Sequence, residues 1–377
     1  MNTYQHPIYL TFLLLFGFSI IAEAQTRTQI QKSVENVIYH DAKVQFKDTP
    51  GFIIGLIAGD STYVFSYGSQ SKTVDIPITD STLFELGGAS KIFTASLIEL
   101  LVQQGELDYD MPLDKYLPKG NQKQTEVLPS IFDLVSHQSG LPRVPVDFGV
   151  KEVQVGNPYA HFSKQDLGHF YNNHTFEKSP QAYSYSNLGY ALLETAIEHT
   201  TKQSFETTLQ NTLLLPYQLQ DTRIQLGNQQ AQLSPGYSII GKKVGPWDCP
   251  SFSGATGIKS SMRDLLDFVQ LQLSDDNFSS MHQKITPTLV DRNSYTAKGW
   301  HVITLKKYYD MIVHTGSTAG HQTFIGLVKE TNTGVVILSN SKLGTNGLGY
   351  FLVKLLNNNF KKSNQQKQED KLTLSRK

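Results

Sequence analysis

Cysteine is nearly absent from this 377-residue chain, with Cys249 as the single one. One cysteine excludes an intramolecular disulfide, and we expect its side chain to act as a small buried hydrophobic group. An excess of charge is also absent, because 33 Lys and Arg balance 33 Asp and Glu. This neutral balance gives no electrostatic reason to expect nucleic acid or an anionic membrane as a partner. Histidines and acids do not cluster at ligand spacing, so the sequence predicts no metal and no cofactor.

One long apolar run is present, from Ile8 to Ala22, and it ends in the small-x-small cleavage signal Ala22-Glu23-Ala24. The run is about 15 residues, short for a bilayer span of about 20. The pattern predicts a signal peptide over residues 1–24 and an exported protein of the periplasm or cell envelope, or a secreted one. No Lys or Arg precedes the run. An uncleaved anchor is therefore the alternative, and membrane contact is expected only in that case.

Strand patterns near both ends of the mature chain enclose a mainly helical middle. Helices are expected over residues 26–39, 89–104, 131–136, 188–200, 205–214, 263–273 and 350–357, and strands over 51–58, 62–67, 299–305, 309–313, 323–328 and 335–339. The 89–104 helix is expected to be amphipathic and closed by Gly105. This order predicts one domain over residues 25–360: an antiparallel sheet built from both chain ends, flanked by helices, plus a helical lobe. A polar tail over residues 361–377 is expected to be disordered.

Three short segments carry residues suited to nucleophilic chemistry: Phe84-Glu85-Leu86-Gly87-Gly88-Ala89-Ser90-Lys91, Tyr183-Ser184-Tyr185-Ser186-Asn187, and His314-Thr315-Gly316-Ser317. Positions 88 and 91 lie one turn apart on one helix face. A hydroxyl at the helix N-terminus would be stabilised as an alkoxide, and a lysine one turn later can assist its deprotonation. A tyrosine held near that lysine's charge can have its pKa lowered enough to act as a general base.

In order and spacing, these segments resemble the Ser-x-x-Lys, Tyr-x-Asn and Lys/His-Thr-Gly signatures of the penicillin-binding-protein and class C β-lactamase family. The resemblance covers roughly residues 30–345. It implies an α+β, β-lactamase/DD-peptidase-like fold and acyl-enzyme hydrolysis of an ester, an amide or a D-amino-acid peptide. It also implies a small-molecule or peptide ligand in the cleft between the lobes.

The resemblance further assigns roles to individual residues. It makes Lys91 and Tyr185 catalytic and gives Asn187 the task of orienting the substrate. The substrate would bind along His314, Thr315, Gly316 and Ser317, and the N–H groups of residues 88 and 317 would form the oxyanion hole. We expect His137 to be structural and His321 to lie at the surface. Tyr159, Trp247 and Phe252 are candidates for lining the cleft.

Glycine occupies position 88, where the resemblance places the nucleophilic serine. Ser90 cannot substitute, because it lies next to Lys91, about 100° around the helix. Two hypotheses stay open: a hydrolase impaired or inactivated by Gly88, and a pseudoenzyme that serves as a ligand-binding or regulatory envelope protein. A membrane-tethered structural protein would require an uncleaved signal. If the serine were present, His314 in place of lysine would favour an esterase or D-amino-acid peptidase over a β-lactamase.

Overall fold

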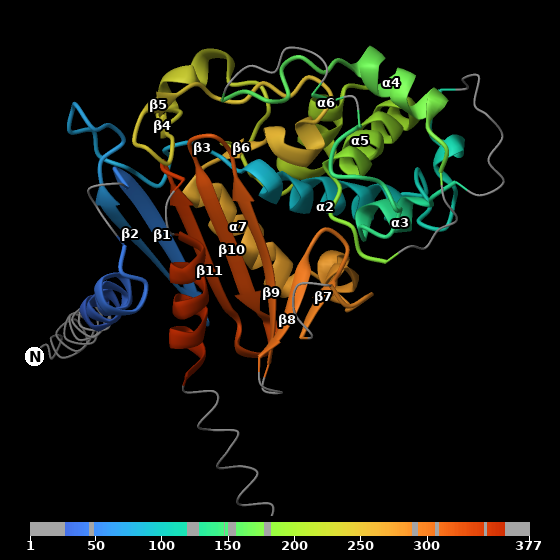
Figure 1. Ribbon diagram of the computed structural model, residues 1–377. Helices are drawn as coiled ribbons and strands as arrows, with labels where there is room; N and C mark the ends of the chain where they lie inside the picture. Colours follow the sequence, from blue (N-terminus) through green and yellow to red (C-terminus); the bar gives the residue numbers. More distant parts are fainter. Residues whose placement is uncertain are drawn as a thin grey trace, which may run out of the picture.

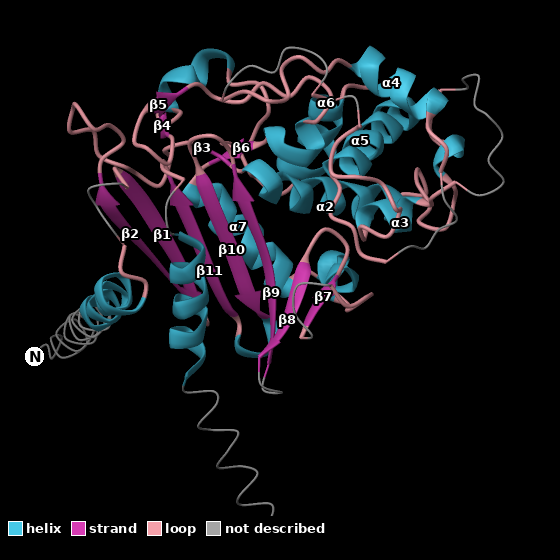
Figure 2. Ribbon diagram, viewed as in Figure 1, coloured by secondary structure: helices cyan, strands magenta, loops and turns pink. Residues whose placement is uncertain are grey.

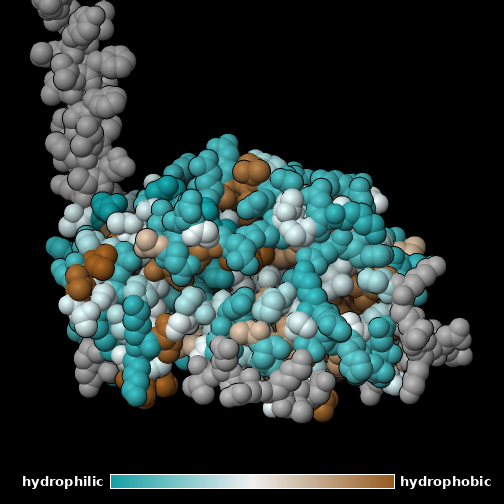
Figure 3. All heavy atoms as spheres, turned by 90° about the horizontal axis from the view of Figure 1, so that it is seen from above, coloured by the Kyte–Doolittle hydropathy of each residue, from teal (hydrophilic) through white to brown (hydrophobic). Residues whose placement is uncertain are grey.

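The computed structural model describes residues 27–44, 49–118, 128–146, 148–149, 156–176, 182–288, 293–305, 309–342 and 345–358. The predicted signal peptide and the predicted polar tail lie outside these ranges. Within them, no helix combines the length and the apolar character that crossing a membrane requires. Seen from above, the described surface is mostly hydrophilic, with separate small hydrophobic areas (Figure 3).

A seven-stranded antiparallel sheet forms the centre of the fold, in the order β2-β1-β11-β10-β9-β8-β7 (Figure 1). Its strands are β1 (Gly51–Ala58), β2 (Ser61–Gly68), β7 (Ser294–Thr296), β8 (His301–Leu305), β9 (Tyr309–Ser317), β10 (Gln322–Val328) and β11 (Thr333–Ser339). Because β1 pairs with β11, with Phe52 opposite Ser339, both chain ends share one sheet, as predicted. Strand β9 continues beyond its predicted end to Ser317, and the three-residue strand β7 was too short to predict.

Two further pairs of short strands flank the sheet. They are β3 (Phe84–Glu85) with β6 (Lys259–Ser260), and β4 (Gly236–Tyr237) with β5 (Lys243–Val244). The first pair joins the segment before Gly88 to the segment that leads into α7.

Helices cover both faces of the sheet and build the second lobe (Figure 2). They are α2 (Ser90–Gln103), α3 (Ile131–Val135), α4 (Lys164–Asn173), α5 (Asn187–Thr201), α6 (Phe205–Leu209) and α7 (Met262–Ser274), with terminal helices at residues 27–36 and 345–358. One hydrophobic core lies between the sheet and α2, α7 and the helical lobe, and a second core lies under the terminal helices. Helix α4 was not predicted from its polar sequence, although Ser163 and Asp166 form a capping box at its start.

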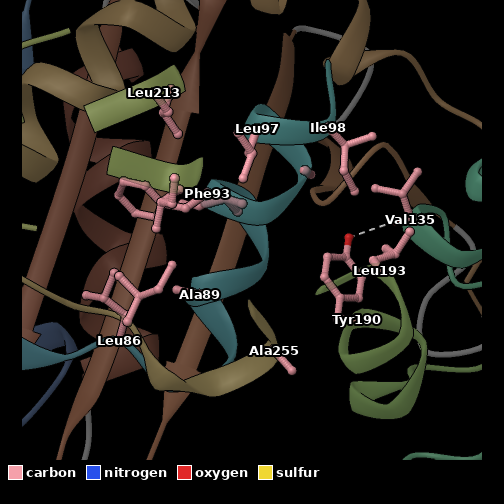
Figure 4. Close-up of a cluster of buried hydrophobic side chains, with 14 of the residues drawn as sticks. Leu86, Ala89, Phe93, Leu97, Ile98, Val135, Tyr190, Leu193, Leu213 and Ala255 are labelled. Atoms are coloured by element: carbon pink, nitrogen blue, oxygen red, sulfur yellow. Dashed lines mark hydrogen bonds between the residues drawn. The ribbon is translucent and has the colours of Figure 1, made fainter. Parts of the chain in front are cut away.

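Helix α2 differs from the expected amphipathic helix, because every side chain from Ser90 to Leu101 is buried. The helix runs between the sheet and the helical lobe, so all of its faces meet other elements (Figure 1). Figure 4 shows its apolar side chains in the core, next to Tyr190 of α5, whose hydroxyl donates to the carbonyl O of Val135 at 2.9 Å. Gly105, with φ of 76°, follows the end of the helix as predicted. Because α2 is buried on all faces, the side chain of Lys91 lies in the interior.

Candidate active site

The turn at Gly87–Ala89 packs directly against the end of β9. A Cβ on Gly316 would overlap the carbonyl O of Leu86. Gly87 has φ of 51°, and a Cβ there would come within 2.7 Å of the backbone N of Ser317. Only glycine permits so close an approach of two backbones. The two glycines therefore bring the first and the third predicted segments into contact.

A cavity of about 330 Å³ opens beside this contact, between the sheet and the helical lobe. Most of the predicted site residues line it: Gly88, Tyr185, Asn187, His314, Thr315, Gly316 and Ser317. Lys91 lies behind the wall, fully buried. Of the other cleft candidates, Tyr159 and Trp247 line the cavity, whereas Phe252 is core. Four lining residues were missed from the sequence, namely Arg143, Thr256, His301 and Asn346.

Lys91 is held by two acceptors inside the protein. Its Nζ donates to Asn187 Oδ1 at 2.7 Å and to the carbonyl O of Ala255 at 2.9 Å. Burial lowers the pKa of Lys91 well below its ordinary value, and the charge of Arg143 lowers it further. The two acceptors fix the position of the amino group behind the cavity wall, and its lowered pKa favours the neutral amine.

Asn187 connects Lys91 to the cavity. It begins α5, whose N-terminus is capped by Ser186, with the Ser186 hydroxyl accepting from the N–H of Gly189 at 2.8 Å. While its Oδ1 accepts from Lys91, its Nδ2 donates to the hydroxyl of Tyr159 at 2.6 Å. Both ends of the amide thus contact the protein, which fixes the orientation of the side chain at the cavity wall.

Tyr185 reaches into the space beside Gly88. A Cβ on Gly88 would lie 2.7 Å from the Tyr185 hydroxyl and 3.3 Å from the carbonyl O of Thr315. Burial raises the pKa of Tyr185, and Arg143 opposes that rise only in part. The expectation of a lowered pKa was wrong, because Lys91 Nζ lies over the face of the tyrosine ring, 4.6 Å from its centroid, and burial outweighs nearby charge. Tyr185 is therefore a protonated phenol in this site.

His314 has one free ring nitrogen in the cavity wall. The side chain is 3% exposed, and its Nδ1 lies 2.9 Å from the carbonyl O of Thr315. A carbonyl only accepts, so Nδ1 carries the proton. Nε2 is buried and has no hydrogen-bond partner among the described residues. Burial lowers the pKa of His314 well below its ordinary value, with His301 and Lys91 adding to the effect, so the ring is neutral.

The sequence of this chain is similar to that of known proteins. Residues 41–350 match the protein family described as Beta-lactamase. The chain belongs to this family. Among curated relatives, the Protein flp of Staphylococcus aureus (strain MRSA252) is 24% identical over 327 residues, which are 82% of this chain and 63% of the relative. The chain thus spans less than two thirds of that relative's length. A Beta-lactamase of Providencia stuartii is 24% identical over 357 residues, covering 82% of this chain and 86% of the relative.

Several solved structures share the fold of this chain. A β-lactamase/D-alanine carboxypeptidase from Yersinia pestis superposes with a TM-score of 0.75 at 20% identity, covering 89% of this chain and 99% of that one. The octameric penicillin-binding protein homologue from Pyrococcus abyssi gives a TM-score of 0.74 at 20% identity, covering 86% and 77%. These likenesses confirm the β-lactamase/DD-peptidase-like α+β fold that the sequence resemblance implied.

A buried histidine–glutamate contact supports one end of the cavity. His321 is 1% exposed, and its Nδ1 lies 2.9 Å from Glu85 Oε2. The expectation that His321 lies at the surface was wrong, because a carboxylate from a distant strand draws it inward. Burial raises the pKa of Glu85, but hydrogen bonds led by His321 lower it more, so the net shift is downward. The other oxygen, Glu85 Oε1, accepts from the N–H of Trp247 at 2.5 Å. The pair therefore positions Trp247 at the cavity wall.

Two remaining residues behave as expected in this family member. His137 is structural: it is 4% exposed, and its Nδ1 accepts from the N–H of Ser186 at 3.2 Å. Cys249 is buried, with 5% exposed. Among the described residues, no group of three or more His, Cys, Asp or Glu side chains is arranged to hold a metal ion.

Proposed function

We propose that this chain is an exported member of the Beta-lactamase family that binds its ligand in the inter-lobe cleft but is impaired in acyl-enzyme chemistry. The observation that carries the proposal is the position of Gly88. Its missing side chain would point into the cavity, beside Tyr185, Thr315 and His314. It also lies three residues before Lys91, in the 3-10 turn Gly87–Ala89 that leads into α2. Position 88 is thus where an attacking oxygen would be needed, and glycine supplies none.

The neighbouring groups support binding more than turnover. In the proposal, Asn187 and the end of β9 still shape the cleft, and the backbone N–H groups of residues 88 and 317 can serve an oxyanion. Removing the nucleophile from such a unit costs several orders of magnitude in rate, roughly 10⁶ in one protease. The ancestral reaction in this proposal is hydrolysis of an ester, an amide or a D-amino-acid peptide.

A second candidate is a non-catalytic ligand-binding or regulatory protein of the cell envelope. One observation favours it: the Tyr185 hydroxyl lies only 2.7 Å from where a Cβ at position 88 would be. A serine does not fit there unless Tyr185 moves. The cleft is therefore packed around a glycine, as expected for a protein whose glycine is an established part of its site.

Covalent labelling tests the proposal. The unaltered protein, Gly88→Ser and Gly88→Ala are each incubated with a fluorescent penicillin and with a fluorophosphonate. Gly88→Ala is the matched control, since it adds the Cβ without the oxygen. We expect label on Gly88→Ser alone, with faster turnover of p-nitrophenyl esters than of β-lactams, because His314 offers no permanent charge to a β-lactam carboxylate.

Two other outcomes of the labelling experiment would lead to different conclusions. Robust labelling of the unaltered protein would show that another group attacks and would refute the proposal. A folded Gly88→Ser variant without label would favour the second candidate.

Export forms a separate part of the proposal. It rests on the apolar run from Ile8 to Ala22 and the small-x-small signal that follows it. Expression in a bacterial host should yield a mature chain that begins at Gln25, which N-terminal sequencing detects. A chain that keeps residues 1–24 and pellets with membranes would favour the tethered alternative.

A further inference from the structure

The turn between β4 and β5 carries two exposed isoleucines. Ile239 is 62% exposed and Ile240 is 73% exposed. The N–H of Gly241 donates to the carbonyl O of Ser238 at 2.8 Å, and Gly241 has φ of 73°, so a tight turn holds both side chains at its tip. Such positions are usually taken by Gly, Pro, Asn, Asp or Ser. The two isoleucines belong to neither hydrophobic core, so burial in this protein does not account for them.

The loop that follows β2 exposes two more aliphatic side chains. Val74 is 59% exposed and Ile76 is 41% exposed. The hydroxyl of Ser69 donates to the carbonyl O of Ile76 at 3.0 Å and accepts from the N–H of Ile76 at 2.9 Å. These bonds tie the backbone of the loop to the protein. The side chains of Val74 and Ile76 are left facing solvent.

The two loops touch, so their exposed side chains lie on one surface. The N–H of Lys72 donates to the hydroxyl of Tyr237 at 3.0 Å, and a Cβ on Gly241 would overlap Lys72 Nζ. Both loops lie at the same end of the sheet (Figure 1). Nine large hydrophobic side chains are exposed in the described ranges, and four of them gather here. Exposed apolar side chains that are scattered singly are ordinary, whereas a group of them marks an interaction site. We call this group the apolar tip: Val74, Ile76, Ile239 and Ile240.

Lysines surround the apolar tip. Lys72, Lys242 and Lys243 are exposed, and none of them forms an ion pair with a described residue. Asp75 is the one acid in the two loops, residues 69–77 and 236–244, so three lysines and one aspartate leave two positive charges in excess. The expectation of no membrane partner rested on the zero net charge of the whole chain, which averages over this local excess.

An anionic lipid surface matches the apolar tip better than a protein partner does. Aliphatic side chains beside lysines suit the boundary between acyl chains and anionic headgroups, where each lysine near the surface adds to the binding. Protein interfaces depend instead on Trp, Tyr and Arg side chains. The two loops contain no Arg or Trp, and their one aromatic residue, Tyr237, is 5% exposed.

We propose that the apolar tip inserts into the surface of a lipid bilayer that contains anionic lipids, with Lys72, Lys242 and Lys243 beside the headgroups. This attachment is peripheral and reversible, and it uses folded loops rather than the apolar run before Gln25. It is independent of the proposed function, because neither loop lines the cavity beside Gly88.

Co-sedimentation with vesicles tests the proposal. The mature protein that begins at Gln25 is used, because the apolar run before it would bind lipid by itself; the described residues all lie within it. It should pellet with vesicles of mixed phosphatidylcholine and phosphatidylglycerol but not with phosphatidylcholine alone, and high salt should weaken the binding. The double variant Ile239→Asn/Ile240→Asn should bind the mixed vesicles about tenfold more weakly. Lys242→Gln/Lys243→Gln should also bind them about tenfold more weakly.

Matched controls remove the same kinds of side chain elsewhere. Leu215→Asn changes an aliphatic side chain that is 64% exposed in the segment after α6. Lys32→Gln/Lys115→Gln removes two exposed lysines from other elements, with the same loss of total charge. Both controls should bind the mixed vesicles nearly as well as the unaltered protein. Thermal melting shows that each variant folds.

A fluorescent label distinguishes insertion from attraction at a distance. Cys249 is the single cysteine and is buried, so Ile240→Cys and Leu215→Cys can each be labelled selectively with a nitrobenzoxadiazole dye. Mixed vesicles should shift the emission of the label at position 240 to the blue and leave the label at position 215 unchanged.

Three results would overturn the proposal: no binding to the mixed vesicles, binding that neither double variant weakens more than its control does, or no blue shift at position 240. Self-association of the unaltered protein that Ile239→Asn/Ile240→Asn abolishes, without vesicle binding, would also overturn it and would assign the apolar tip to a contact between copies of the chain.

Discussion

A methyl group added at position 88 would enter a crowded part of the cavity. Gly88→Ala puts a Cβ 2.7 Å from the Tyr185 hydroxyl and 3.3 Å from the carbonyl O of Thr315. The first separation is shorter than an ordinary non-bonded contact by more than about half an ångström. The tyrosine ring has little freedom to withdraw. Its centroid lies 4.6 Å from Lys91 Nζ, 5.1 Å from the Arg143 guanidinium carbon and 4.7 Å from the His137 ring.

The expected cost follows from two opposing terms. Overpacking of this kind destabilises by about 1–3 kcal/mol. Replacing glycine by alanine where φ is unstrained stabilises by about 0.4–1 kcal/mol through the unfolded chain, and Gly88 has no left-handed φ. We therefore expect Gly88→Ala to lower the free energy of unfolding by about 1 kcal/mol. In a Tyr185→Phe background the obstructing oxygen is gone, and the same substitution should cost less than about 0.5 kcal/mol.

Urea unfolding of the four proteins of this double-mutant cycle, followed by the fluorescence of Trp247 and Trp300, measures the coupling. Coincident transitions by fluorescence and circular dichroism are needed before the free energies are compared. An equal cost of Gly88→Ala with and without the tyrosine hydroxyl would refute the reasoning. Tyr185 would then not obstruct position 88, and the packing argument for the second candidate function would fail with it.

Three further outcomes are expected. Gly316→Ala should destabilise the protein severely, because its Cβ would overlap the carbonyl O of Leu86. Gly168→Ala in α4, with open space around it, should be neutral or stabilising by up to about 1 kcal/mol. Thermal melting compares the two variants. The pKa of Lys91 is lower in the folded than in the unfolded chain, so the unfolded state binds more protons. The free energy of unfolding should therefore rise with pH towards about pH 10. Lys91→Met should flatten that rise in urea titrations. Glu85→Gln should lower the free energy of unfolding in urea titrations by about 1–3 kcal/mol, since it removes a buried partner of His321. Asp80→Asn, in an exposed ion pair with Arg263, should cost less than about 1 kcal/mol in the same titrations.

The position of the predicted site residues could be read from the sequence because the three segments follow a fixed order. Gly88, Tyr185 and His314 are far apart in the chain, yet all line one cavity. The orientation of their side chains could not be read in the same way. The Tyr185 hydroxyl fills the space at Gly88 because of packing by Lys91 and His137, which no local pattern records. The prediction of a lowered pKa for Tyr185 was wrong for the same reason, since that pKa is set by burial and burial depends on the whole fold.

Residues outside the motifs were harder to predict. Arg143 is a lone arginine in a loop, and its one local signal is the Ser139-Gly140-Leu141-Pro142 stretch before it. His321 is buried by a carboxylate 236 residues away in the chain, beyond the reach of any window of sequence.

Helix α2 was predicted at almost its observed bounds, but its environment was not. Its polar side chains suggested a solvated face, and they are instead paired inside. The hydroxyl of Thr94 donates to the carbonyl O of Gly254 at 2.7 Å, and Glu99 accepts from Lys298 at 2.8 Å. Periodicity shows which residues are apolar, but only tertiary partners decide whether the polar ones face water.

The pairing of β1 with β11 also sets when the protein can fold. Phe52 meets Ser339 across the sheet, so a strand made early in synthesis must wait for one made near the end. Contacts of such long sequence separation form slowly, and until then the apolar edge of β1 stays unpaired and open to wrong partners. A nascent chain therefore stays unfolded until most of it is made. That delay makes chaperone binding during synthesis more important than for a fold of local contacts.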